Sequence, residues 1–400
     1  MHAGNPHPSI AGRCWASAHY CAPLIGSIAA QAASADRTRS LDGDMLAALK
    51  RNDVMRLSGS PEIGGLNASI VQIANELRTV AQACTSTAWC LWNHLCTFHH
   101  FAGLLGPSHR EFLQRIVAEH EWVCFPAGAS TSIKGASADG VTRLTGVAAF
   151  GSGARYAEWA GVAFEQDGWR TPCFTMADLR EHTVRIDPTW EAMSVRASST
   201  DHIHYEGTAV PSSRVVALEP FHRVGYRDPA KPVLHARYRE DWVALSVVWL
   251  GAMATGVAAI SLDECALGIR ERIAIYGTKM VEKPTIHVNL GRARAVLDCA
   301  HDTVYAAMAE TDARIAAGVI PSEGDYFRQT SAGMQAVLLC DEVMKLVLRV
   351  LGGNGLREGT DFERRYRDFQ AMPLHINGHV DRITEQAGRI ALGLPAQNAF

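Results

Sequence analysis

The spacing of apolar residues divides the chain into three regions, of which the first is helical. Between residues 44 and about 120, apolar positions recur at intervals of three and four residues, which places them on one face of a helix. The stripe that shows this most plainly is Ile70, Ile73, Ala74, Leu77, Val80, Ala81 and Cys84. A later helix is predicted to begin at Ser108, because Ser108 and Glu111 have capping-box spacing. We expect a helical domain over residues 25–124, after a flexible N-terminus over residues 1–24.

The second region, residues 125–232, has the pattern of a small β domain. Its apolar runs are short and rich in Val, Thr and aromatic residues, and Gly, Pro, Asp and Ser separate them, as strands and turns require. Three of these runs predict strands, at residues 161–164, 183–186 and 202–205.

The third region, residues 233–400, returns to long helical patterns. They are interrupted near Pro284, near Pro321 and at the glycine-rich break Gly352–Gly355. Thr360 and Glu363 repeat the capping-box spacing. Four long helices separated by such breaks favour an antiparallel bundle. The predicted fold class is therefore mainly α with an inserted β domain.

Composition narrows the kind of protein. A hydrophobic share of 48% and a charged share of 20% over 400 residues are typical of an ordinary globular chain. The formal net charge of -3, with scattered Lys and Arg, argues against a nucleic-acid partner. The 10 Cys form no CxxC pair, so we expect reduced thiols and a cytoplasmic protein. No run approaches about 20 uninterrupted apolar residues, so no membrane span is expected.

Two segments give this order of domains a family resemblance. Residues 190–205, continued by Val210-Pro211, resemble the Trp…Gly-Met-Arg-Ala-Thr-Gly-Ser…Val-Pro stretch in the β domain of the acyl-CoA dehydrogenase superfamily. Residues 351–355, followed by residues 364–368, resemble its Gly-Gly-x-Gly…Arg-x-x-Arg-Asp signature. The resemblance covers most of residues 35–395. It implies the acyl-CoA dehydrogenase fold, with an N-terminal helical domain, a middle β-barrel-like domain and a C-terminal four-helix bundle, assembled as a homotetramer.

The base that a dehydrogenase of this superfamily needs is missing from its commonest place. There a Glu that takes the α-proton of the thioester usually follows the Arg-Asp pair, whereas here Arg367-Asp368 leads to His375 with no carboxylate before residue 381. A second position, near the start of the first bundle helix, holds Glu240 and Asp241. An FAD-dependent desaturase that uses Asp241 or Glu240 as base therefore stays open as an alternative. The simpler interpretation is that the two acids complement a helix dipole.

Other segments resemble the two-component flavin-dependent monooxygenases of the same superfamily. Residues 84–89 are similar to their Cys-Gly-Ser-Thr-Ala-Trp helix. Residues 146–153, with Trp159 beyond them, are similar to their Gly-x-Trp-x-x-x-Ser-Gly…Trp strand, except that Ala148 stands where a Trp is usual. His375 matches the place where these enzymes put a His near the flavin. The resemblance implies a monooxygenase that hydroxylates an aromatic or heteroatom-containing small molecule through a C4a-hydroperoxyflavin.

That chemistry has three candidate catalytic residues. A flavin hydroperoxide survives where water is excluded and hydrogen-bond donors hold it, and the Ser152 hydroxyl would supply one donor. His375 would act as general base on a phenol or hold the distal peroxide oxygen, because an unperturbed pKa of about 6.5 allows proton exchange near neutral pH. His99 is the third candidate, on a helix that also carries His94 and His100. No carboxylate or Cys completes tetrahedral spacing with this trio, so no metal site is expected.

The resemblance also implies a set of cofactor contacts. The aromatic members would wall the ring, the glycines would let backbone approach a phosphate, and an Arg would hold the diphosphate. Each of these residues could instead have a purely structural role, in a turn, in the core or on the surface. The set is Trp122, Phe125, Phe150, Ser152, Trp159, Arg272, Gly352, Gly353 and Gly355.

Reduced FMN or FAD is the expected cofactor, with molecular oxygen as co-substrate. Because no Gly-x-Gly-x-x-Gly follows a strand, we expect a separate reductase to deliver reduced flavin by diffusion. The expected place for the flavin is a sealed cavity between the β domain and the terminal bundle, around Ser152 and His375. Whether carbon, nitrogen or sulfur is oxygenated stays open.

Overall fold

The structure is a computed structural model that describes residues 16–126, 132–218, 227–274 and 277–395. Its N-terminal helices are α1 (Ile25–Thr38), α2 (Gly43–Lys50), α3 (Ile70–Ala83), α4 (Thr85–Leu105) and α5 (Arg110–Ala118). The helix predicted from the stripe over residues 70–84 is confirmed as α3. Every residue of α4 is buried, so this helix runs through the interior and can present side chains to several neighbours.

The start of the described chain is held in place. Of the N-terminus that we expected to be flexible, residues 1–15 lie outside the described residues. The backbone amides of His19, Tyr20 and Cys21 all donate to the carboxylate of Glu76, which is 1% exposed. Residues 16–24 are thus fixed on α3, because three amides satisfy one buried carboxylate.

Neither of the two predicted capping boxes forms completely in the structure. Ser108 does not begin α5, because Pro107 starts a short 3-10 turn through His109 and the helix follows it without a side-chain cap. Thr360 does cap α10 (Asp361–Phe369), accepting from the Glu363 backbone amide. The Glu363 carboxylate does not complete the box, since it binds Arg367 instead.

The middle of the chain forms a single mixed sheet with the order β6-β7-β3-β2-β4-β5-β8, and β1 pairs with β4. The three predicted strands are confirmed as parts of β4, β6 and β7. The strands are β1 (Val123–Cys124), β2 (Ser132–Ala138), β3 (Val141–Gly151), β4 (Trp159–Gln166), β5 (Cys173–Asp178), β6 (Val184–Asp187), β7 (Asp201–Pro211) and β8 (Val216–Ala217).

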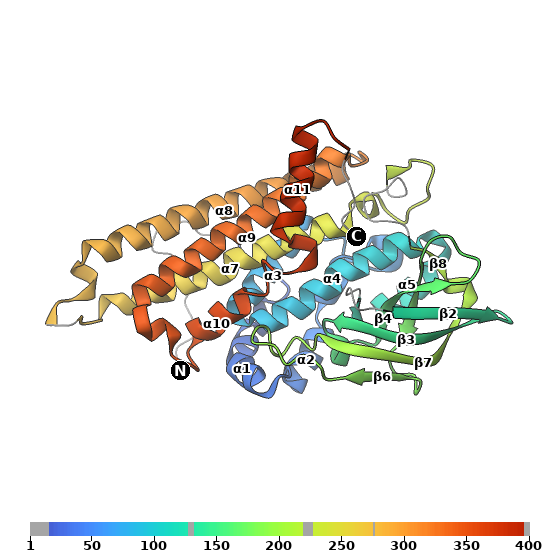
Figure 1. Ribbon diagram of the computed structural model, residues 1–400, viewed down its shortest axis with the longest axis horizontal. Coiled ribbons are helices and arrows are strands. Elements are labelled where there is room, and N and C mark those ends of the chain that lie inside the picture. The colour runs from blue at the N-terminus through green and yellow to red at the C-terminus, as the bar shows by residue number, and fades with distance from the viewer. Residues whose placement is uncertain (1–15, 127–131, 219–226, 275–276, 396–400) are drawn as a thin grey trace.

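The C-terminal part is built on three long helices, α7 (Trp242–Arg270), α8 (Pro284–Ala316) and α9 (Glu323–Leu351). They lie side by side at one end of the molecule, and the sheet lies at the other (Figure 1). The expected fourth long helix is divided into α10 and α11 (Val380–Ala391), because the chain turns between residues 370 and 379 around Pro373. The predicted fold class, mainly α with an inserted β domain, is confirmed, with this change to the last helix.

Close packing of α7 against α9 depends on two glycines. A Cβ on Gly333 would lie 2.4 Å from the Val247 carbonyl oxygen, and one on Gly251 would lie 2.9 Å from the Gly333 carbonyl oxygen. Only glycine allows this approach. The contact fixes the N-terminal half of α7, which contributes residues to the site described below.

Helix α7 is also apolar and long enough to cross a membrane by length and composition, although no membrane span is predicted from uninterrupted apolar runs. In the structure 94% of its most apolar window is buried among other helices. Its composition is therefore explained by a position in the core.

Candidate active site

Ser152 lies where α4, the end of β3 and residues 194–201 meet. Its Oγ accepts a hydrogen bond from Trp89 Nε1 at 3.1 Å and lies 3.0 Å from Thr200 Oγ1. Thr200 Oγ1 in turn lies 2.7 Å from Ser198 Oγ. All four side chains are buried. The result is a dry line of hydroxyls that ends on an indole N–H.

A bulge at the end of β3 aims Ser152 inward. The register between β3 and β7 shifts between Ala148 and Gly151, and Phe150 in the bulge has φ 62°, an uncommon value for a bulky residue. The Phe150 side chain points outward, is 51% exposed and lies near the rings of Trp190 and His202. The structure therefore does not bring Phe150 to the Ser152 hydroxyl, since the bulge turns it to the opposite face.

His375 approaches the same place from the C-terminal part. Its ring contacts Trp92 at 4.7 Å and Trp89 at 5.5 Å between centroids. Trp89 thus joins Ser152 to His375 and occupies the space directly between them. A flavin ring therefore cannot lie directly between Ser152 and His375, where we expected it, and has to lie beside the Trp89 indole.

The hydrogen bonds of His375 define its protonation. Its Nδ1 accepts from the Asn377 backbone amide at 3.2 Å, so a neutral imidazole carries its hydrogen on Nε2. Burial, assisted by the positive charge of Arg382, lowers the pKa of His375 to about 4. Asn377 itself is anchored to Ser246 Oγ on α7 at 3.0 Å. At neutral pH His375 is therefore an uncharged donor held between aromatic rings.

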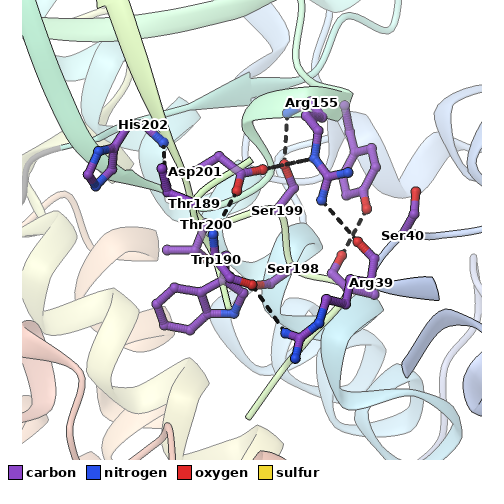
Figure 2. Close-up of polar contacts among 12 residues, drawn as sticks. Arg39, Ser40, Arg155, Thr189, Trp190, Ser198, Ser199, Thr200, Asp201 and His202 are labelled. Carbon is purple, nitrogen blue, oxygen red and sulfur yellow. Dashed lines mark hydrogen bonds and ion pairs between the residues drawn. The ribbon is translucent and has the colours of Figure 1, made fainter. Parts of the chain in front are cut away.

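A buried carboxylate fixes the segment that carries Ser198 and Thr200. Figure 2 shows Asp201 accepting from Arg155 Nε at 2.8 Å, from Ser199 Oγ at 2.7 Å and from the Trp190 backbone amide at 3.1 Å. Within this segment Val195 and Ser199 have φ values of 42° and 47°. Such values are strained, above all for a β-branched residue, and persist only where the surroundings impose them.

The three histidines of α4 have different surroundings. His94 Nε2 lies 3.0 Å from the Met55 carbonyl, its Nδ1 accepts from the Val123 amide, and burial lowers its pKa to about 4. His99 Nε2 lies 3.0 Å from the Glu240 carbonyl, and burial lowers its pKa to about 3. His100 stacks on Trp242, with ring centroids 4.7 Å apart.

Helix geometry decides which of these histidines faces the site. His100 follows Trp89 by eleven residues, or three turns, and therefore shares its face, while His99 points toward Tyr238. The structure brings Ser152 and His375 together but places His99 beside Glu240 and Tyr238, away from them.

The remaining aromatic candidates are spread over three environments. The Trp122 indole lies under the turn after Ser152, and a Cβ on Gly153 would come within 3.3 Å of its Nε1. Phe125 packs near His100 and Trp242, at 5.6 and 6.0 Å between centroids. Trp159 donates to Glu121 at 2.6 Å, and three arginine side chains lie over its ring. Its contacts fix it in the β domain and do not bring it to Ser152.

The glycines and Arg272 form a separate corner at the end of α9. Arg272 Nη1 donates to the Leu351 carbonyl at 3.0 Å, so this guanidinium reaches the break that begins at Gly352. A Cβ on Gly352 or Gly353 would meet nothing within 4 Å, whereas Gly355 is packed under Leu348. The backbone at Gly352 and Gly353 is therefore open to a ligand phosphate or a second subunit. Helix α10 connects this corner to the segment of His375.

Three buried acidic side chains, two at the start of α7 and one in α10, have different roles. Glu240 is held by Arg314 at 2.8 Å and by Gln329 at 3.1 Å. Asp241 caps α7 through Oδ1, and burial raises its pKa to about 7. Burial also raises the pKa of Asp368 to about 7, although its Oδ1 accepts from the Val195 amide.

The residues that join these parts carry no functional signal in the sequence. Trp89 stood in a quoted motif without a role, and only contacts show that it links Ser152 to His375. Thr200 and Asn377 likewise lie among other polar residues in the sequence, so nothing there distinguishes them.

Comparisons with known proteins place this geometry in a fold family. Residues 248–379 match the family model for the acyl-CoA dehydrogenase C-terminal domain. The chain is similar to XiaF from Streptomyces sp., solved in complex with FADH2 and glycerol, with a TM-score of 0.85, 20% identity and 95% of each chain covered. The protein thus has the acyl-CoA dehydrogenase fold.

Two curated relatives are more specific. A pigment production hydroxylase from Rhodococcus sp. is 23% identical over 94% of this chain and 96% of its own length. The oxygenase subunit HsaA of a flavin-dependent monooxygenase from Rhodococcus jostii is 24% identical over 93% and 97%. The resemblance to the acyl-CoA dehydrogenase superfamily, and within it to two-component flavin-dependent monooxygenases, is confirmed.

Proposed function

We propose that this protein is the oxygenase component of a two-component flavin-dependent monooxygenase that hydroxylates an aromatic or heteroatom-containing small molecule. The observation that carries the proposal is the joined set Ser152, Trp89 and His375. Ser152 and Trp89 are buried, His375 is partly buried, and no carboxylate contacts the three side chains among the described residues. Similarity to relatives named as a hydroxylase and a monooxygenase subunit over nearly their full length supports it.

The residues present fit a flavin. Leu374 and Ile376, on either side of His375, are 70% and 50% exposed, and a ring system or a second subunit would cover such apolar surface. The buried Trp122 Nε1 has no hydrogen-bond partner among the described residues and lies under the turn after Ser152. The open backbone at Gly352 and Gly353 is suited to the phosphate end of a flavin.

Bound reduced flavin, as FMN or FAD, supplies the electrons that activate molecular oxygen. The chain supplies exclusion of water by Trp89 and Trp92 and a set of fixed hydrogen-bond donors. Of the two roles expected for His375, the geometry favours donation from Nε2, because Nδ1 already accepts from Asn377. In this proposal Ser152 is the second donor, and its hydroxyl is oriented by Trp89 and Thr200.

The proposal includes a separate reductase, a homotetramer and a cytoplasmic location. A separate reductase is supported by the name of the Rhodococcus jostii relative, which is described as an oxygenase subunit. A tetramer would let the corner of Arg272 and Gly353 complete the flavin site of a neighbouring subunit. Size-exclusion chromatography with light scattering, with and without FAD, would test this assembly.

The alternative is a desaturase that uses a carboxylate base. Glu240 is a poor base because Arg314 and Gln329 occupy both its oxygens. Asp241 retains one oxygen without a hydrogen-bond partner in the described chain, and its raised pKa suits proton transfer. This observation keeps the alternative testable.

One experiment separates the two functions. The purified protein is supplied with an NADH-dependent flavin reductase, FMN or FAD, ¹⁸O₂ and a panel of phenols, arylamines and aryl sulfides. The monooxygenase predicts one ¹⁸O atom in the product, and His375→Gln should divert most of the reduced flavin to hydrogen peroxide while leaving the fold intact. Bleaching of bound FAD by an acyl thioester under anaerobic conditions, without ¹⁸O incorporation, would instead identify the desaturase.

A further inference from the structure

Asn93 is a buried amide without a partner. The residue is 8% exposed, and its Oδ1 has no hydrogen-bond partner among the described residues. Its backbone carbonyl, by contrast, accepts from Thr97 Oγ1 at 2.7 Å. Buried amide oxygens in native proteins are nearly always satisfied, so an exception needs an explanation. A ligand that completes the hydrogen bond is one such explanation.

The position of Asn93 on α4 points to the substrate as that ligand. Asn93 follows Trp89 by four residues and precedes His100 by seven, so the three side chains share one helix face. Trp89 contacts Ser152 and His375, while His100 stacks on Trp242 of α7. Side chains on a helix lean toward its N-terminus, which directs the Asn93 amide toward Trp89.

Helix α7 closes this face from the other side and runs antiparallel to α4. Trp92 Nε1 donates to the Ser246 carbonyl at 2.9 Å, and the His100–Trp242 stack lies one to two turns further along both helices. Asn93 therefore lies between the Ser152–Trp89–His375 set and an aromatic stack. A flat substrate that reaches His375 along this seam would pass the amide.

A second acceptor lies at the far end of the stack. Asp241 is 7% exposed, and its Oδ2 has no hydrogen-bond partner among the described residues, since capping of α7 uses Oδ1. Arg227, Glu240 and Tyr326 are the charged or titratable groups that act on it. Asn93 Oδ1 on α4 and Asp241 Oδ2 at the start of α7 are thus both open acceptors, which are complementary to a ligand that donates.

We propose that Asn93 binds the substrate through its amide oxygen, and that the substrate is an aromatic molecule with a hydrogen-bond donor, such as a phenol or an arylamine. An aryl sulfide has no donor for either acceptor. The assignment of the ligand as the substrate rests on the proposed function, while the preference for a donor rests on the amide alone.

Binding of matched ligand pairs tests this without flavin or oxygen. Phenol is compared with anisole, and indole with 1-methylindole, by isothermal titration calorimetry of the full-length protein, because these ligands themselves absorb and fluoresce where tryptophan does. The wild type should bind the donor-bearing member about 2- to 13-fold more tightly, the value of one neutral hydrogen bond. Asn93→Leu should reduce this ratio to about 1.

Two further measurements exclude a merely structural role. Replacing an unpartnered buried amide with an apolar side chain of similar size should leave the Tm of the ligand-free protein unchanged or raise it. Asn93→Ala serves as a second variant if Leu fails to fold. Ser261→Ala removes another buried, unpartnered oxygen from α7, about 22 Å along the helix from Ser246, and should keep the wild-type ratio.

The outcomes are decisive for the proposal. The proposal is overturned if the ratio of the two affinities in each ligand pair is unchanged in Asn93→Leu. It is also overturned if the wild type binds both members of each pair equally, or binds neither phenol nor indole. Loss of the ratio in Asn93→Leu without any hydroxylation by the wild type would support the binding role and contradict only the proposed monooxygenase function.

Discussion

Replacing Asp201 with Asn tests whether the network in Figure 2 holds the Ser198 and Thr200 hydroxyls in place for Ser152. Asp201 is fully buried, and its carboxylate accepts three hydrogen bonds, from Arg155, Ser199 and the backbone of Trp190. Asn keeps the size of the side chain but loses the charge. It also replaces one acceptor oxygen with a donor that faces other donors.

The expected loss of stability follows from the exposure of the partner. Breaking a buried ion pair by removing one charge costs roughly 3–5 kcal/mol. The Arg155 side chain is 34% exposed and keeps its bond to the Arg39 carbonyl, so we expect about 2–3 kcal/mol. With an unfolding entropy of ~2.1 cal/mol/K per residue, a chain of 400 residues should lose roughly 2–4 °C in Tm.

The assay has two readouts and a matched control. Differential scanning calorimetry gives Tm, and the ratio of hydroxylated product to oxidised flavin gives the coupling, which should fall as Ser198 and Thr200 move. Asp187→Asn is the control, because its pairs with Arg185 and His204 are exposed to solvent, which screens their charges, so this change should leave Tm nearly unaltered. An unchanged Tm for Asp201→Asn would refute the stability argument, and a lower Tm with wild-type coupling would make the network purely structural.

Three further predictions concern buried acids and the glycine corner. Burial raises the pKa of Asp368 to about 7, so the stability that the protonated carboxyl contributes is present at low pH and is lost as the pH rises from about 4 to 7. The Asn side chain of Asp368→Asn does not titrate, so the stability of the variant relative to wild type should increase by roughly 3 kcal/mol between pH 5 and 8. Denaturation at each pH measures this difference. Arg272→Ala should weaken binding of reduced flavin about 10- to 100-fold in anaerobic titrations if the guanidinium binds a phosphate, and an unchanged Kd would remove it from the flavin site. The KM for a donor-bearing substrate should rise as pH falls below about 7, where Asp241 becomes protonated, and a pH profile that Asp241→Asn leaves unaltered would contradict this.

Much of the fold follows from sequence periodicity, but element boundaries depend on local chemistry. The stripe from Ile70 to Cys84 and the short apolar runs of the sheet predicted helix α3 and three strands correctly. The predicted start of α5 at Ser108 was wrong, because Pro107 begins a turn that replaces the expected Ser108 cap. The last helix is divided because Pro373 ends the pattern that appeared continuous.

The candidate site was predictable where a motif marked it and unpredictable where geometry decided. Ser152 and His375 were identified through resemblance, and the structure brings them together through Trp89. The direction of Phe150 could not be foreseen, because one extra residue in a bulge turns side chains to the other face. Nothing in the sequence marked Asn93, since an unsatisfied hydrogen bond is a property of surroundings assembled from distant segments.

The most direct test of the central claim is stopped-flow absorbance after anaerobically reduced FMN or FAD, mixed with the protein, meets oxygen. Sheltering of the flavin beside Trp89, Ser152 and His375 predicts a transient species, distinct from reduced and oxidised flavin, that decays more slowly than any seen without protein. His375→Gln and Ser152→Ala should shorten its lifetime. A single phase of oxidation at the rate of free reduced flavin, unchanged by the protein, would contradict the account.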